Sequence, residues 1–133
     1  MKRRELREHI FELLFRIEFH EGEQMPEQVK MFFEDIEMII IEEKDKAYIE
    51  KKYADVVEKL EEIDASINAV AEGWKTNRMG KVDLTLIRLA VYEMKFDEEV
   101  PVNVAINEAV ELAKKFGGDE TPAFINGILA KLA

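Results

Sequence analysis

The stretch PVNVAINEAVELAKKFGG, from Pro101 to Gly118, has the features of a complete amphipathic helix. Pro101 precedes the helix because proline is not tolerated in a helix interior, and Gly117 is placed to end it. A lysine pair falls in the last turn, where cations suit the helix dipole. Apolar residues recur at three- and four-residue steps and form one face: Ala105, Ala109, Leu112, Ala113 and Phe116. Helix-forming and helix-capping preferences do not explain the next segment. They leave open why, in an acidic chain, two glycines and Asp119–Phe124 come directly after the lysine pair.

The same spacing predicts six further helices and no strand, so we expect an all-α fold of seven helices. The first predicted helix covers roughly 2–20 and the third about 46–63. The second starts near Pro26 and ends at the segment IIIEEKDK. Asp64 and Asp83 are predicted N-caps of the next two helices, the second running over 84–96. Thr121 and Pro122 are predicted as N-cap and first position of the last helix. Ile39–Ile41 alone could form a strand, but its flanks are helical.

Asn126-Gly127 lies inside the predicted last helix, where glycine costs about 1 kcal/mol relative to alanine. Between strands the pair would indicate a hairpin. Because the surrounding apolar residues have helical period, we expect Gly127 to pack closely against another helix.

Composition predicts one soluble domain, because the chain has 133 residues, of which 47% are hydrophobic and 36% charged. No apolar run approaches a membrane span, and no cysteine is present, so a cytoplasmic protein is the simplest interpretation. The net charge of −10 lies in the middle of the chain: residues 1–20, 21–72 and 73–133 carry +1, −10 and −1. A local basic patch at either end is therefore compatible with the acidic total.

Motifs for catalysis or metal binding are weak. His9 and His20 are the two histidines, no cysteine can complete a zinc site, and Ser66 is the single serine. Gly117-Gly118 lacks the length and the Lys-Ser/Thr ending of a P-loop. We expect no catalytic residues, no metal and no cofactor, and an enzyme is kept as the alternative class of function.

The first predicted helix carries Arg3, Arg4 and Arg7 along one side, which Phe11 and Phe15 continue at four-residue steps. Guanidinium groups beside aromatic rings suit single-stranded nucleic acid, because they meet phosphates while the rings stack on bases. The alternative, which periodicity alone favours, is that both rings pack on a neighbouring helix.

Arg88 interrupts the apolar segment LTLIRLAVYEM, so its charge must be paired or must reach an edge of the core. Glu93 and Glu108 are candidate partners. We expect Arg88 to be a structural residue.

Three segments resemble the C-terminal half of the NusB family of bacterial transcription antitermination factors. They are WKTNRMGKVDLTLIRLAVYEM (74–94), VPVNVAINEAVELAKKFG (100–117) and FINGIL (124–129). The opening RRELREHIFELLF (3–15) resembles the arginine-rich first helix of the family. The acidic residues 21–72 match only in helical character and length, so the resemblance is specific over about 74–129 and suggestive over 3–15.

The resemblance implies two small helical bundles, about 1–63 and 64–133, and no catalysis. It implies binding of boxA-type single-stranded RNA together with the small-subunit ribosomal protein NusE, in RNA polymerase complexes that suppress termination, notably on ribosomal RNA operons. No membrane partner is expected. A monomer and a homodimer are both left open.

The resemblance also assigns site residues. The loop after Phe116 is expected beside the N-terminal arginines, where both hold RNA, and the C-terminal bundle is expected to dock NusE through Tyr92 and Glu93. Glu5, Glu8, Glu12 and Ala123 lower the positive potential relative to the family, so we expect weaker RNA affinity or stronger dependence on NusE. The expected RNA-binding residues are Arg3, Arg4, Arg7, Phe15, Lys114, Lys115, Phe116, Asp119, Glu120 and Phe124.

Overall fold

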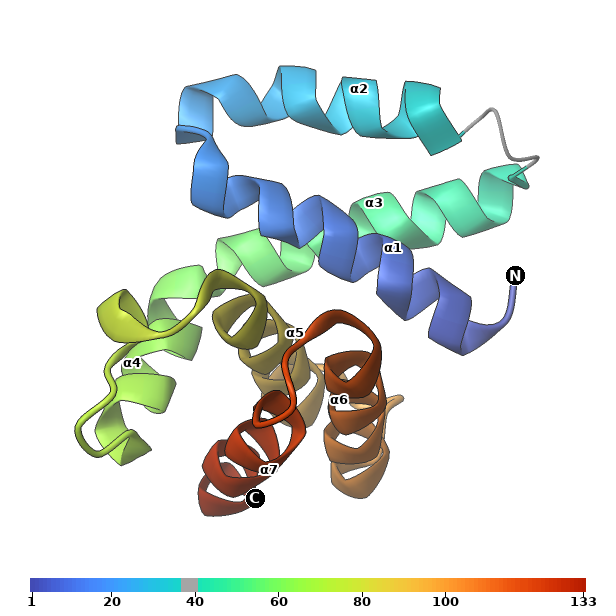
Figure 1. Cartoon of the computed structure of the whole chain (residues 1–133). Coiled ribbons are helices and arrows are strands. Elements are labelled where there is room, and N and C mark those ends of the chain that lie inside the picture. The colour runs from blue at the N-terminus through green and yellow to red at the C-terminus, as the bar shows by residue number, and fades with distance from the viewer. Residues whose placement is uncertain (37–40) are drawn as a thin grey trace. The chain divides into compact units, whose positions relative to one another are not determined.

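The computed structural model describes residues 1–36 and 41–133, and these contain seven α-helices, three short 3₁₀ turns and no strand (Figure 1). The predicted all-α class is confirmed. Ile39 and Ile40 lie outside the described residues. The helices are α1 (Arg3–Phe15), α2 (Met25–Ile36), α3 (Glu43–Glu58), α4 (Leu60–Val70), α5 (Lys81–Phe96), α6 (Val102–Phe116) and α7 (Thr121–Leu132).

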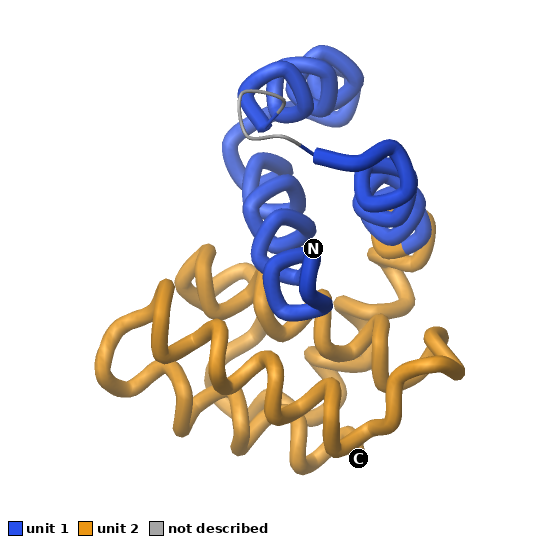
Figure 2. The backbone as a smooth tube through the Cα atoms, turned by 90° about the vertical axis from the view of Figure 1, so that its right-hand side faces the viewer, with its two compact units in different colours: residues 1–55 blue, residues 56–133 orange. Residues whose placement is uncertain are grey.

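The chain forms two compact units, Met1–Asp55 and Val56–Ala133 (Figure 2). The division falls inside α3, earlier than the boundary near 63 expected from the sequence. Each unit buries its own apolar residues. In the first unit the most buried are Ile10, Leu13 and Ile49, and in the second they include Ile63, Ile67, Ile87, Ile125 and Leu129.

In the first unit, α1 ends at Phe15 and not near residue 20. A 3₁₀ turn, Arg16–Phe19, follows it. The chain then enters α2 through a reciprocal cap, in which the Glu21 backbone N–H donates to Gln24 Oε1 at 2.8 Å. The helical pattern breaks at the extended residues His20 and Glu21, and this capping box starts a 3₁₀ turn, Gly22–Gln24, that leads into α2.

In the second unit, α5, α6 and α7 pack against one another, and α4 packs on α5 and α7. Helix α5 is apolar on most of its circumference, with six buried aliphatic side chains. A helix of this kind belongs in a core, and α5 therefore anchors the loops at its two ends. The six are Leu84, Leu86, Ile87, Leu89, Ala90 and Val91.

Three predicted N-caps are wrong. Helix α4 begins at Leu60, so Asp64 lies inside it, and α5 begins at Lys81 with Gly80 as its N-cap. Helix α7 has Glu120 as N-cap, with Thr121 as its first residue. The polar side chains concerned form tertiary contacts instead: Asp64 pairs with Arg88, and Asp83 accepts a hydrogen bond from Thr121.

Arg88 has its charge paired, as expected, and Asp64 is a partner that the sequence did not indicate. A purely structural role for Arg88 stays a prediction. Gly127 contradicts expectation, because it is exposed and an added Cβ would meet nothing within 4 Å. The glycine with a steric requirement is Gly117, which ends α6 as predicted. An added Cβ there would lie 2.6 Å from Thr121 Cβ.

Candidate nucleic-acid interface

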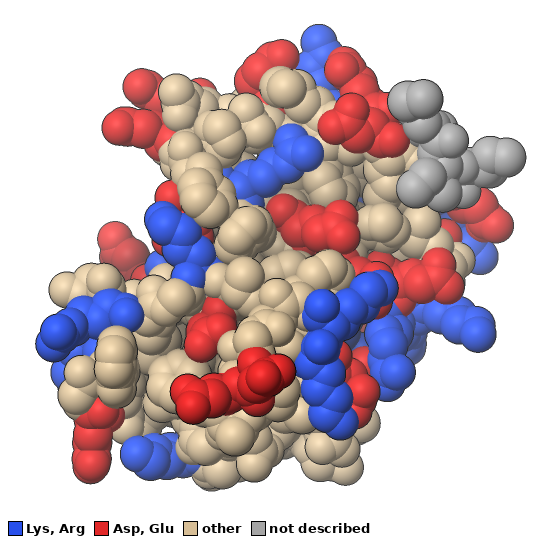
Figure 3. Space-filling model, viewed as in Figure 1, with Lys and Arg blue, Asp and Glu red and all other residues tan. Residues whose placement is uncertain are grey.

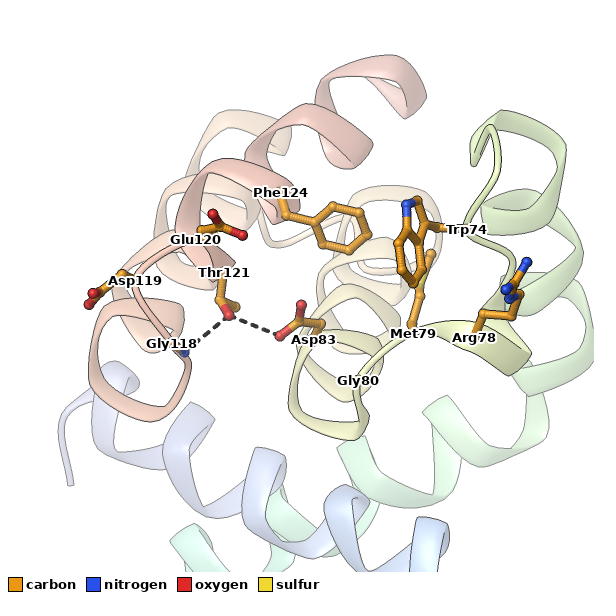
Figure 4. A pocket seen from close by; sticks show the side chains of 10 residues that line it. All are labelled: Trp74, Arg78, Met79, Gly80, Asp83, Gly118, Asp119, Glu120, Thr121 and Phe124. Atoms are coloured by element: carbon orange, nitrogen blue, oxygen red, sulfur yellow. Dashed lines mark hydrogen bonds between the residues drawn. The ribbon is translucent and has the colours of Figure 1, made fainter.

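An open pocket of about 710 Å³ lies in the second unit (Figure 4). Three segments form it: the loop after α4, the start of α5, and the α6–α7 loop with the first turns of α7. The lining residues are Trp74, Arg78, Met79, Gly80, Asp83, Gly118, Asp119, Glu120, Thr121 and Phe124.

Two aromatic side chains project into this pocket from separate segments, Trp74 from the loop after α4 and Phe124 from α7 (Figure 4). Trp74 is 57% exposed, which is unusual for so large an apolar side chain. The guanidinium carbon of Arg78 lies 5.9 Å from the Trp74 ring centroid. Arg78 lies on the side of Trp74 away from Phe124 in Figure 4, so the opposite ring face is turned to the pocket.

Asn68 holds the Trp74 loop against the end of α4. Its Oδ1 accepts a hydrogen bond from the Thr76 backbone N–H at 2.8 Å, and its Nδ2 donates to Thr76 Oγ1 at 3.2 Å. Lys75 Nζ donates to the Asn68 carbonyl oxygen at 2.6 Å. The turn uses a positive φ of 75° at Gly73, which glycine adopts without strain. Trp74 is thus exposed on a loop that is fixed on its C-terminal side.

The opposite wall is organised around Thr121, which is 7% exposed. Its hydroxyl accepts from the Gly118 backbone N–H at 3.1 Å and donates to Asp83 Oδ1 at 3.1 Å (Figure 4). The neighbouring Asp119 and Glu120 are exposed. Two carboxylates therefore face solvent at the pocket while a third carboxylate is engaged in holding the loop.

The first unit presents Arg3 and Arg4 as exposed side chains on α1, whereas Arg7 is only 7% exposed. Phe15 is half-buried. Its ring stacks on Phe11 with a centroid separation of 5.8 Å and meets Phe19 edge-on at 5.0 Å. Phe11 is 3% exposed, so it is a core residue. Both of these ring contacts of Phe15 are within α1 and the turn that follows it, and packing of Phe15 on a neighbouring helix stays a prediction. Part of Phe15 is still accessible.

The family model described as the NusB family matches residues 4–133. The chain belongs to the NusB family. A transcription antitermination protein NusB from Lachnoclostridium phytofermentans is 54% identical over 99% of this chain and 98% of its own length.

Solved NusB structures share the fold. A T. maritima NusB has a TM-score of 0.86 and 34% identity, covering 100% of this chain and 91% of that one. A crystal structure described as the antitermination factors NusB and NusE in complex with double-stranded RNA has a TM-score of 0.81 and 29% identity. The match covers 98% of this chain and 94% of that chain.

Several site residues expected from the NusB resemblance come together in the pocket, namely Asp119, Glu120 and Phe124. The lysines in the last turn of α6 do not line it: Lys114 Nζ pairs with Glu111 at 3.0 Å, and Lys115 Nζ lies 5.4 Å from the centroid of the Phe116 ring. Contact of RNA with Lys114, Lys115 and Phe116 stays a prediction, as does binding of one RNA by the arginines and this loop.

Sequence reasoning missed Trp74 and Arg78 as site residues, although both belong to the NusB-like motif. The available signal was a tryptophan and an arginine four residues apart in a loop bounded by Gly73 and Gly80.

The expected NusE-docking side chains are buried, Tyr92 at 8% exposed and Glu93 at 2%. Neither is on the accessible surface, and their part in docking stays a prediction. A charge reversal at Glu93 would test the fold as much as the interface.

On the face shown in Figure 3, several Lys and Arg side chains lie next to one another right of centre, with Asp and Glu side chains around them. Among the residues that the structure describes, no helix is long and apolar enough to cross a membrane, and no group of three potential metal ligands occurs.

Proposed function

We propose that this chain is a cytoplasmic transcription antitermination factor and not an enzyme. It binds boxA-type single-stranded RNA together with ribosomal protein NusE and joins RNA polymerase complexes, notably on ribosomal RNA operons. The observation that carries the proposal is the pocket between Trp74 and Phe124, in a chain of the NusB family. A chain in the crystal structure of NusB and NusE with double-stranded RNA shares the fold over 98% of this chain, and this supports RNA and NusE as partners.

The pocket chemistry suits an unstacked nucleobase. A base stacks on Trp74 or Phe124, which is worth about 1–3 kcal/mol per base, and every base offers a π face. Glu120 is an acceptor only and is assigned to amino or imino N–H groups on the base edge. Asp119 is not assigned to the base edge, because its carboxylate points away from both rings in Figure 4, although the two carboxylates are both exposed. They also repel phosphate, and this favours insertion of the base with the backbone outside.

Phosphate contacts are assigned to exposed cations. Arg3 and Arg4 on α1 are accessible, and Arg78 at the pocket is exposed, with its guanidinium carbon 5.9 Å from the Trp74 ring centroid. Guanidinium groups bind phosphate oxygens in a planar, two-pronged geometry. Phosphate binding supplies affinity, while the pocket supplies preference for particular bases.

A single strand is the proposed form of the ligand because bases in an A-form duplex are stacked and paired, whereas single-stranded bases can be splayed into a pocket. The related crystal structure contains double-stranded RNA, so the two forms have to be compared directly.

The test is a titration of end-labelled RNA with the purified chain, with and without NusE from the same organism, monitored by fluorescence anisotropy. Three RNAs are used: a boxA-like single strand, a scrambled single strand and the boxA-like duplex. We expect the boxA-like single strand to bind tightest, and NusE to tighten it further. Equal affinity for all three RNAs, with no effect of NusE, would overturn the proposal.

We also propose that the second unit carries the NusE-docking surface. Val102 and Val104, at the start of α6 and just after Pro101, are 41% and 37% exposed, so they offer apolar area to a partner. Val102→Asp adds a charge that the first turn of a helix tolerates. It should weaken NusE binding and leave binding of RNA by the chain alone unchanged. Unaltered affinity for NusE would count against this surface.

A further inference from the structure

We propose that Asp83 and Thr121 are positioning residues for RNA binding: their hydrogen bond holds the α6–α7 loop and Phe124 in the geometry that accepts a base. The inference rests on the proposed function and adds to it the device that fixes one wall of the pocket. We refer to Asp83, Thr121 and the Gly118 N–H as the clasp.

The clasp joins segments that are far apart in sequence. Asp83 and Thr121 are separated by 38 residues, yet Thr121 Oγ1 lies 3.1 Å from Asp83 Oδ1. Asp83 is in the first turn of α5, the helix with many buried side chains, so the clasp ties a solvent-exposed loop to the core of the unit.

Thr121 has no hydrogen-bonding capacity to spare for donating to RNA. Its single hydroxyl proton goes to Asp83, and the oxygen already accepts from the Gly118 N–H at 3.1 Å. Its side chain is also buried, in contrast to exposed Asp119 and Glu120. Thr121 therefore acts through the loop and not by touching the ligand.

The loop needs such a restraint because it contains two consecutive glycines, which have the largest conformational freedom in the unrestrained chain. Fixing a residue costs about 1–2 kcal/mol of backbone entropy. If folding has already fixed the loop, RNA binding does not have to supply that free energy, so affinity is higher. Gly117 fits the same device, because its lack of a Cβ lets Thr121 approach.

The test begins with Thr121→Val, which keeps the shape but removes the hydroxyl, and Thr121→Ser, which restores the hydroxyl. Each is titrated with boxA-like RNA across a salt series. We expect about a tenfold loss of affinity for Thr121→Val, because RNA binding then has to supply about 1–2 kcal/mol to order the loop, and recovery for Thr121→Ser. The salt slope should stay at the wild-type value because no phosphate contact is lost.

A double-mutant cycle decides whether Asp83 acts through Thr121. If it does, Asp83→Ala combined with Thr121→Val should bind RNA no more weakly than the weaker single variant. Losses that add would mean that Asp83 contacts RNA itself, and would overturn its role as a positioning residue.

Amide hydrogen exchange at Gly118 separates this proposal from the function on which it rests. Thr121→Val should speed exchange of that amide, with or without RNA, in protein whose helical content is unchanged. A wild-type chain that binds no RNA would defeat the proposed function. The clasp alone would be contradicted if the wild-type chain binds RNA and the Thr121→Val variant has the same RNA affinity and the same Gly118 amide exchange rate as wild type.

Discussion

The guanidinium of Arg88 on α5 holds the carboxylate of Asp64 on α4 through two parallel hydrogen bonds, Nε to Oδ1 at 2.9 Å and Nη2 to Oδ2 at 2.8 Å. The Arg88 side chain is 14% exposed and that of Asp64 is 26% exposed. The pair thus fastens α4 to the core helix of the second unit, at a position where a lone charge would be costly.

Arg88→Leu should lower the free energy of unfolding by about 1.5–3 kcal/mol, the range for hydrogen bonds to charged groups. RNA affinity of the folded fraction should not change, because the pair does not line the pocket. Urea unfolding followed by circular dichroism measures the first effect. A folded, fully helical Arg88→Leu protein that binds neither RNA nor NusE would contradict a purely structural role.

Gly117→Ala should destabilise the chain and weaken RNA binding together. The added methyl group would lie 2.6 Å from Thr121 Cβ and Cγ2, so the clasp has to move, and overpacking of this kind costs about 1–3 kcal/mol. Gly118→Ala is the matched control, because its Cβ would meet nothing within 4 Å. If the two variants had equal stability and equal affinity for RNA, the close approach at Gly117 would be of no consequence.

Gly127→Ala should raise stability by about 1 kcal/mol, because the residue lies in the interior of α7 and an added Cβ is in open space. A chain of this size should then melt about 3–5 °C higher. Thermal unfolding followed at the helical circular dichroism band is the measurement. An unchanged or lower melting temperature would show that the glycine has a structural role that the geometry does not reveal.

Arg4→Ala should weaken RNA binding and flatten the log–log salt dependence by about 0.7, the contribution of one phosphate contact on a single strand. Lys44→Ala is the control, since Lys44 is also an exposed cation of the first unit and pairs with Glu42 at 3.4 Å. A slope that is the same for wild type and both variants would make Arg4 a solvated side chain of α1.

Much of this fold could be predicted from the sequence because it depends on short-range periodicity. The apolar face of α6 and the stop at Gly117 appear in the structure as predicted. The interpretation failed where a polar side chain had a tertiary partner. Asp64, Asp83 and Thr121 all resemble N-caps locally, and no local rule reveals that Asp64 meets Arg88, 24 residues away.

The candidate site was predicted in part for a similar reason. Asp119, Glu120 and Phe124 came from resemblance to a family motif, and the structure places them at one pocket. Trp74 and Arg78 complete that pocket from a loop about 40 residues earlier in the chain, and helical periodicity carries no information about loops. Glu93 was expected at the NusE-docking surface, and also as a candidate partner of Arg88, and it is 2% exposed.

The central claim, that a base of single-stranded RNA enters the pocket, is tested most directly by the fluorescence of Trp74, the single tryptophan of the chain. In the measurement, boxA-like RNA is titrated into a mixture of the chain and NusE while the tryptophan emission is recorded. The Trp74→Phe variant, treated in the same way, gives the background signal from the other components. We predict saturable quenching of the Trp74 emission, at the same midpoint as RNA binding measured by anisotropy, and loss of affinity by about 1–3 kcal/mol for Phe124→Ala. RNA that binds with full affinity while the Trp74 emission stays unchanged, and that binds Phe124→Ala equally well, would contradict the account.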